Sequence, residues 1–105
     1  MKSLIIIPAY NEEACIEQTV RDILEHAPIF DYIVINDCSK DRTKEICEKN
    51  QFHYIDLPVN LGIGGAVQTG YKYACNHGYD YAVQVDGDGQ HDPRFLEQML
   101  QVMQE

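Results

Sequence analysis

Ser3-Leu4-Ile5-Ile6-Ile7-Pro8 opens the pattern that decides the fold, because a short apolar run here ends at a proline. The run predicts a strand over Ser3 to Ile7, and Pro8 marks its end since proline has no N–H for a sheet ladder. A helix is predicted next, from about Glu12 to Ala27 with Asn11 as its N-cap. Its apolar residues recur at helical spacing on one stripe, namely Ile16, Val20, Ile23, Leu24 and Ala27.

The same unit of strand and helix repeats along the chain. Strands are predicted over 32–36, 53–57 and 81–85, and helices over 42–49, from the glycine-rich stretch 60–65 to about 76, and from Asp92 onward. The small residues Ala66, Gly70 and Ala74 permit the third helix to approach the sheet closely, and Gly78 ends it. This order predicts an α/β fold with an open, mainly parallel sheet and helices on both faces, which stops after the fourth β-α unit.

Composition bounds the possible partners. The chain has 105 residues, which is enough for one domain. Its formal net charge of −9 argues against a nucleic-acid partner. The four cysteines show no zinc or disulfide spacing, so we expect a reducing, cytoplasmic location. The longest aliphatic run, Leu4 to Ile7, is far too short to cross a bilayer, so no membrane segment is expected in this chain.

Polar residues follow the end of each predicted strand, where ligands bind in parallel α/β sheets. The most informative group is Asp86-Gly87-Asp88-Gly89-Gln90. Its carboxylates can turn toward one point and suit Mg²⁺ or Mn²⁺, or they can simply cap a polar turn. His91 stands where the calcium-loop pattern needs glycine, so that pattern is excluded.

The other three loops each allow two interpretations. Pro8 to Glu12 offers an aromatic ring, an amide and a carboxylate, which suit a base and ribose or a simple turn. Asp37 can accept from a base N–H or cap its own turn. The loop 60–65 can bring its backbone close to a ligand or form a tight turn. Val67 breaks the dinucleotide fingerprint, and no P-loop is present.

Four segments, 5–12, 33–43, 60–66 and 86–93, together resemble the inverting family 2 glycosyltransferases in order and spacing. The D-x-D-x-Q-H variant looks closest to the dolichyl- and polyprenyl-phosphate sugar transferases. The resemblance implies a GT-A fold and a metal-dependent transfer of sugar, with inversion, from a UDP- or GDP-sugar to a glycan or lipid-phosphate acceptor such as polyprenyl phosphate.

The resemblance also implies roles for individual residues. The residues that it assigns to binding the donor are Pro8, Tyr10, Glu12, Ile35, Asp37, Asp86 and Gly87. The residues that it assigns as ligands of a divalent cation, Mg²⁺ or Mn²⁺, are Asp86, Asp88 and Gln90. Cys38 stands where family members more often have glycine, and Ile63 where many have a basic residue, so less neutralisation of the diphosphate by the protein is expected.

The family's general base is expected downstream of residue 105. We therefore infer that residues 1–105 are the N-terminal nucleotide-sugar-binding part of a GT-A domain, a fragment that binds donor without turnover. Its parent is expected at the cytoplasmic face of a membrane. The sheet edge left uncovered by truncation predicts self-association.

Two other functions remain as alternatives at this point. One is a non-catalytic nucleotide-binding module of the same fold. The other is a haloacid-dehalogenase-type phosphatase, in which a D-x-D motif also follows an apolar strand. That motif belongs to the first strand, however, and continues with Thr or Val where Gln90 stands.

Overall fold

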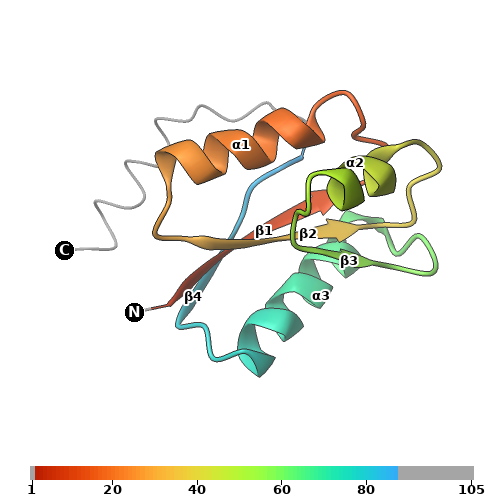
Figure 1. The fold of residues 1–105 in the computed structure, drawn as a ribbon. Helices are drawn as coiled ribbons and strands as arrows, with labels where there is room; N and C mark the ends of the chain where they lie inside the picture. Colours follow the sequence, from red (N-terminus) through yellow and green to blue (C-terminus); the bar gives the residue numbers. More distant parts are fainter. Residues whose placement is uncertain (1, 88–105) are drawn as a thin grey trace.

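The computed structural model describes residues 2–87, which form an open parallel sheet with helices on both faces (Figure 1). The elements in chain order are β1 (Ser3–Ala9), α1 (Ile16–His26), β2 (Asp31–Asn36), α2 (Thr43–Lys49), β3 (Tyr54–Asp56), α3 (Gly62–Asn76) and β4 (Tyr81–Gln84). The strands lie in the order β3-β2-β1-β4, and each neighbouring pair is parallel. The predicted parallel α/β sheet is confirmed, while the helix predicted from Asp92 lies outside the described residues.

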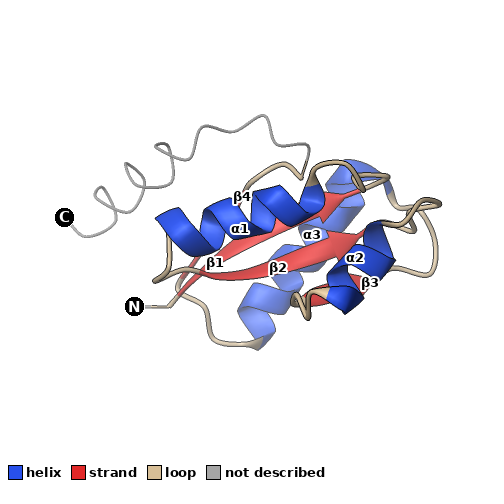
Figure 2. Cartoon of the chain, turned by 45° about the horizontal axis from the view of Figure 1, so that its top comes forward, coloured by secondary structure: helices blue, strands red, loops and turns tan. Residues whose placement is uncertain are grey.

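β1 runs through the centre of the sheet, between β2 and β4. Its side chains alternate between the two faces, as the geometry of a strand requires. Ile5 and Ile7 pack into the core beneath α1 and α2, whereas Leu4 and Ile6 pack beneath α3. α1 and α2 therefore cover one face and α3 the other (Figure 2), which confirms the predicted layers.

The prediction that Pro8 ends the first strand is wrong, because β1 continues through Pro8 to Ala9. Ile6 faces β4, since its carbonyl accepts a hydrogen bond from Val85 N at 2.9 Å, and Ile6 is the last residue of β1 that pairs with β4. Residues two apart along a strand face the same neighbour. The missing N–H of Pro8 thus faces the side where β4 has already ended, and it removes no ladder hydrogen bond.

The start of α1 also differs from the prediction. The helix begins at Ile16 rather than near Glu12, and no side chain caps it. Asn11 is not its N-cap: its backbone has a φ of 55°, and its Oδ1 accepts a hydrogen bond from Lys40 N at 2.8 Å. The asparagine therefore bonds to a loop 29 residues away instead of to its own helix.

The predicted apolar stripe of α1 is buried except at one position. Leu24 is 47% exposed, and the fully buried members are Ile16, Val20, Ile23 and Ala27. Among the residues that the structure describes, no helix is both long and apolar enough to cross a membrane.

α3 approaches the sheet through its three small residues, which are buried as predicted: Ala66, Gly70 and Ala74. A Cβ added at Gly70 would lie within 3.0 Å of three side-chain atoms of Ile6, so only glycine permits this distance between helix and strand. The helix ends at Asn76, and Gly78 follows with a φ of 73°. The predicted stop at Gly78 is confirmed.

Candidate functional site

The loops that follow β1, β2 and β4 meet at one edge of the sheet around a hollow of about 200 Å³. Asp37 N donates to the carbonyl of Ala9 at 2.9 Å, which joins the first two loops. Gly87 packs so closely on the end of β1 that an added Cβ would lie 3.2 Å from the carbonyl oxygen of Pro8. The lining residues come from these loops and from α3: Pro8, Ala9, Tyr10, Glu12, Asp37, Ile63, Ala66, Asp86 and Gly87.

The hollow brings together most of the residues that the sequence assigned to donor binding. Those that line it are Pro8, Tyr10, Glu12, Asp37, Asp86 and Gly87. Ile35 is the exception, because it is fully buried in the core beneath α3 and does not line the hollow. The roles of the gathered residues toward a ligand remain predictions.

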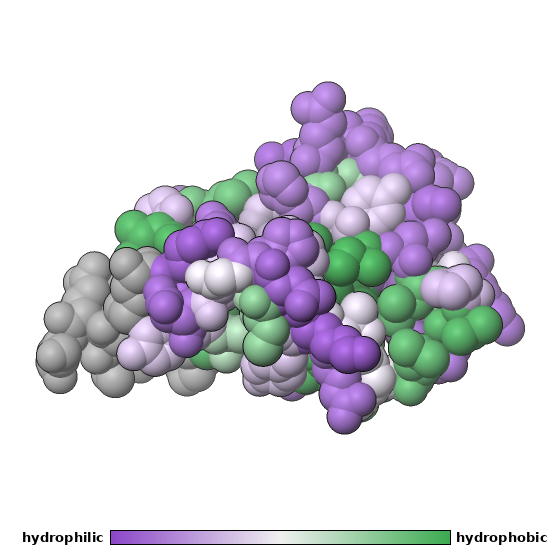
Figure 3. All heavy atoms as spheres, turned by 90° about the horizontal axis from the view of Figure 1, so that it is seen from below, coloured by the Kyte–Doolittle hydropathy of each residue, from purple (hydrophilic) through white to green (hydrophobic). Residues whose placement is uncertain are grey.

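The α3 wall of the hollow consists of Ile63 and Ala66. Ile63 belongs to the stretch 60–65, for which the sequence left a ligand-facing role open, whereas Ala66 was predicted only to let the helix approach the sheet. Ile63 is 64% exposed and follows two other exposed apolar residues, Val59 and Leu61. Figure 3 shows hydrophobic atoms gathered toward the right-hand end of the face that α3 covers. This side of the hollow is therefore apolar.

Asp37 lies in the wall of the hollow and binds the backbone just before α3. Its side chain is buried, and Oδ1 accepts a hydrogen bond from Leu61 N at 2.7 Å, one residue before α3. Its carbonyl accepts a further hydrogen bond from Asn60 Nδ2 at 3.3 Å. Within the described part of the chain, Oδ2 has no hydrogen-bond partner. Asp37 therefore does not cap its own turn, where Ser39 N donates to Asn36 Oδ1 at 3.3 Å instead. Its Oδ1 holds the backbone just before α3.

Asp86 follows β4 as predicted, and its exposed side chain lines the hollow. Its Oδ1 accepts a hydrogen bond from Gln84 Nε2 at 2.9 Å. Asp88 and Gln90, the other two predicted metal ligands, lie outside the described residues. Over residues 2–87, no group of three or more histidine, cysteine or acidic side chains is placed to hold a metal ion.

The charge around the hollow is negative. Glu12, Asp37 and Asp86 contribute three carboxylates to its lining, and no lysine or arginine is among the described residues that line it. A diphosphate in this hollow would meet repulsion unless a cation entered with it. Carboxylates of this kind are the oxygen ligands that Mg²⁺ and Mn²⁺ prefer.

Cys38 lies in the loop after β2 with a backbone conformation that is unusual for a residue other than glycine. Its φ is 59°, in the left-handed region that glycine enters without steric cost. Its thiol lies 3.7 Å from the carbonyl of Pro58. The backbone at Cys38 therefore carries local strain.

A parallel α/β sheet with polar loops gathered at the carboxyl ends of its strands is the architecture of the GT-A glycosyltransferases. The family model described as Glycosyl transferase family 2 matches residues 4–105, and the chain belongs to this family. Membership of this family excludes the alternative that the chain is a haloacid-dehalogenase-type phosphatase.

Two relatives and one solved structure illustrate the family. The chain is 32% identical to an undecaprenyl-phosphate mannosyltransferase of Micrococcus luteus, over 98% of this chain and 44% of the relative. It is 35% identical to a UDP-N-acetylglucosamine–dolichyl-phosphate N-acetylglucosaminyltransferase of Methanococcus voltae, over 92% of this chain and 45% of the relative. The chain thus spans less than half the length of either relative.

The solved structure is a mannosyltransferase of Pyrobaculum calidifontis in complex with GDP-Man and Mn²⁺. It superposes with a TM-score of 0.73 at 21% identity, over 83% of this chain and 27% of that protein. The likeness at this identity concerns the fold.

Proposed function

We propose that residues 1–105 are the nucleotide-sugar-binding part of a GT-A domain in a metal-dependent, inverting glycosyltransferase. The donor is a UDP- or GDP-sugar. The observation that carries the proposal is the hollow at the strand ends, which gathers an aromatic ring, a buried carboxylate and two further carboxylates from three loops. These loops belong to segments far apart in the sequence, so their convergence is a property of the fold.

The donor would lie across the hollow with different groups against different walls. Tyr10, which is 41% exposed, offers its ring to the base, and Asp37 Oδ2 offers an acceptor to a base N–H. Glu12 offers oxygen acceptors to the ribose hydroxyls. Asp86 and Gly87 border the space for the diphosphate, where the close approach of Gly87 to β1 would crowd a side chain.

A divalent cation, Mg²⁺ or Mn²⁺, fits the donor set and the charge of this hollow. Asp86 is the described residue that would hold it, and Asp88 and Gln90 are the further ligands predicted from the sequence. Bound there, the cation would neutralise the departing diphosphate. The three carboxylates on the lining and the Mn²⁺ present in the solved mannosyltransferase both support this proposal.

The acceptor proposed for the whole protein is a lipid phosphate such as polyprenyl phosphate. The names of both relatives state such an acceptor for those proteins. A lipid acceptor would place the whole protein at a membrane, and we propose the cytoplasmic face of that membrane. Inversion needs a base at the acceptor hydroxyl or an acceptor phosphate that is already nucleophilic.

The proposal is tested by calorimetric titration of the 105-residue chain with UDP and with GDP, each with and without Mn²⁺. We expect one nucleotide to bind, and only when Mn²⁺ is present. The variant Asp86→Asn keeps the size of the side chain and removes its charge, so it should weaken Mn²⁺-dependent binding by about tenfold or more.

Asp22→Asn is the matched control, because Asp22 lies on α1 outside the hollow and accepts a hydrogen bond from Gln18, one turn earlier on the same helix. This variant should bind like the unmodified chain. Metal-independent binding of equal strength in Asp86→Asn would contradict the proposed cation site. Binding of neither nucleotide by a chain that circular dichroism shows to be folded would contradict the proposed function.

A further inference from the structure

Three consecutive backbone N–H groups in the loop after β1, those of residues 11–13, all donate to side chains of the loop after β2 or of the first residue of α2. The acceptors, in chain order of the donors, are Ser39 Oγ at 2.9 Å, Thr43 Oγ1 at 2.9 Å and Asp41 Oδ2 at 3.1 Å. Donors and acceptors are 28 to 31 residues apart in the sequence. We call Ser39, Asp41 and Thr43 the loop clamp.

The clamp has its own internal support. Asp41 Oδ1 accepts hydrogen bonds from Thr43 Oγ1 at 2.6 Å and from Thr43 N at 2.9 Å. The threonine hydroxyl therefore gives its proton to Asp41, which leaves its oxygen to accept from Glu12 N. Thr43 is fully buried, so water does not compete for this hydroxyl.

The charge of Asp41 strengthens the same contacts. Burial raises the pKa of the Asp41 carboxyl, but hydrogen bonds from Thr43 and from the backbone of Glu13 outweigh burial, and the pKa lies below its usual value. Hydrogen bonds to an ionised carboxylate are stronger than those between neutral groups. Asp41 is thus ionised at neutral pH and holds both loops through charged hydrogen bonds.

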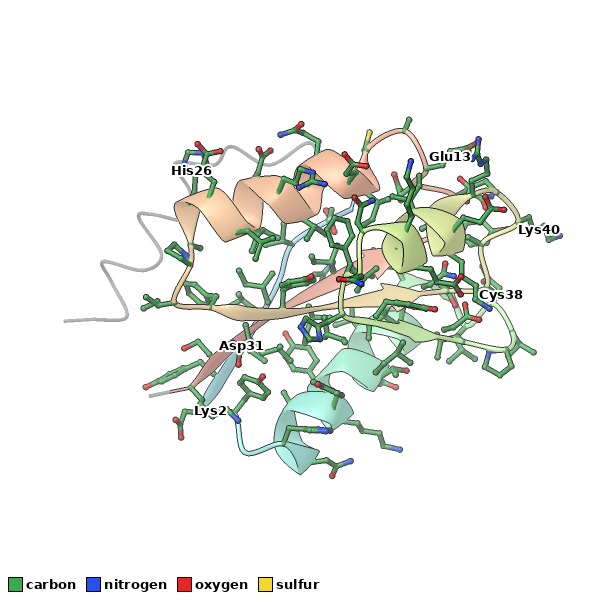
Figure 4. All side chains as sticks on the ribbon, viewed as in Figure 1. Lys2, Glu13, His26, Asp31, Cys38 and Lys40 are labelled. Atoms are coloured by element: carbon green, nitrogen blue, oxygen red, sulfur yellow. The ribbon has the colours of Figure 1, made fainter. Side chains whose placement is uncertain are left out.

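The clamp lies next to the hollow without lining it. Tyr10 and Glu12, on either side of Asn11, line one part of the hollow, and Asp37 lines another. In Figure 4, Glu13, Cys38 and Lys40 lie at the same end of the molecule, far from Lys2 and Asp31 at the other end. The clamp therefore connects the wall formed by Tyr10 and Glu12 to the wall formed by Asp37, through residues that do not line the hollow.

Both joined loops contain a residue in an unfavourable backbone conformation. Asn11 and Cys38 have φ values of 55° and 59°, which residues other than glycine seldom adopt. Such conformations persist only where surrounding contacts hold them. On the β1 side, Asn11 is held by the bond of its N–H to Ser39 and by the bond that Lys40 N donates to its side chain.

We propose that Asp41 and Thr43 are positioning residues for nucleotide binding, which set the separation between the Tyr10–Glu12 wall and the Asp37 wall. The proposal rests on the proposed function of the hollow. It goes beyond it by assigning a role to residues that touch no part of the hollow. A nucleotide held by both walls needs their separation fixed, because a loosened wall loses contacts on one side of the ligand.

Three variants test the role of Thr43 with UDP and GDP as probes, each with Mn²⁺. Thr43→Val has nearly the same shape and removes the hydroxyl, so Glu12 N loses its acceptor. We expect its Kd for the nucleotide to rise about tenfold, and Thr43→Ser, which restores the hydroxyl, to return the Kd to within about twofold of the unmodified chain. Thr69→Val is the matched control, because over residues 2–87 its hydroxyl bonds only to Gly65 O within α3, and its Kd should be unchanged.

The free energy of unfolding is measured on the same samples to separate positioning from stability. A merely structural role would lower the stability of Thr43→Val and leave the Kd of the folded molecules unchanged, which would overturn the proposal. If Thr43→Val does not fold, Ser39→Ala is used instead, since it removes one clamp acceptor outside the core, and we expect a rise of about threefold in Kd. An unchanged Kd in Ser39→Ala would equally overturn it.

Failure of the proposed function gives a different result, because the unmodified chain would then bind neither UDP nor GDP. In that case the positioning role falls with it. Amide hydrogen exchange separates this result from loss of the clamp, since slow exchange at Glu12 that becomes fast in Thr43→Val shows that the clamp is intact although the hollow binds neither nucleotide.

Discussion

Replacing Gly70 with alanine tests whether α3 lies as close to β1 as the structure shows. The added Cβ would fall within 3.0 Å of three side-chain atoms of Ile6, which is fully buried on the central strand. Overpacking of this kind costs about 1–3 kcal/mol, and alanine gains about 1 kcal/mol over glycine inside a helix. Three close contacts with one confined side chain place the cost at the upper end of that range. We therefore expect Gly70→Ala to lower the free energy of unfolding by about 1–2 kcal/mol, or the Tm by roughly 5–15 °C.

Gly64→Ala on the same helix is the control for the gain in helix propensity. An added Cβ there has no atom within 4 Å, and its φ is not in the left-handed region. We expect this variant to raise the free energy of unfolding by about 0.5–1 kcal/mol. Urea unfolding followed by circular dichroism measures both changes, with the m-value checked for constancy.

A double-mutant cycle with Ile6→Ala decides whether the cause is the contact with Ile6. Removing the branched side chain of Ile6 removes all three atoms that the new methyl group would meet. In that background, Gly70→Ala should no longer destabilise the chain. The close packing of α3 on β1 would be refuted if Gly70→Ala were as stable as the unmodified chain, or if it were equally destabilising with and without Ile6.

Two further predictions concern the loop after β2. Cys38→Gly should raise the free energy of unfolding by about 0.5–1 kcal/mol, because relief of the left-handed strain, about 1–2 kcal/mol, exceeds the greater backbone entropy of glycine; a loss of stability in urea unfolding would contradict this. Asp41→Asn should be less stable than the unmodified chain at neutral pH. Since the folded pKa of Asp41 lies below the ordinary 3.8, its contribution is complete above that pH and is lost as the pH falls through the folded value. The stability difference between the two chains should therefore shrink as the pH falls through 3.8 and below it, and a difference independent of pH would show that the charge of Asp41 does not matter.

Much of the fold could be predicted because its signals are local. The alternation of short apolar runs with helical stripes identified each strand and helix that the structure describes. The small residues of α3, with Gly70 at their centre, also predicted the close approach to the sheet, because side-chain size limits helix-to-strand distance wherever the helix packs. The loops of the hollow followed from the same reasoning, since parallel strands end at one edge.

Three sequence predictions failed or shifted because their causes lie far away in the chain. Asn11 is of a residue type that often caps helices, but its side-chain oxygen accepts a hydrogen bond from Lys40 N instead. Pro8 is an ordinary strand terminator, but its missing N–H faces the side where β4 has ended. Ile35 belongs to the segment that the resemblance aligns with the base pocket, but it points into the core beneath α3.

The sequence by itself determined the class of fold, the edge that carries the site and the residue types that gather there, because these follow from hydrophobic period and from the order of strands and helices. The tertiary structure alone decided which polar atoms are already used and which face the hollow. Asp37 Oδ1 accepts a hydrogen bond from Leu61 N just before α3, while Oδ2 has no partner over residues 2–87. The Thr43 hydroxyl accepts from Glu12 N and donates to Asp41. The physical reason is that a hydrogen bond depends on the distance and direction of its partner, and partners about 30 residues apart are brought together only when the whole sheet forms.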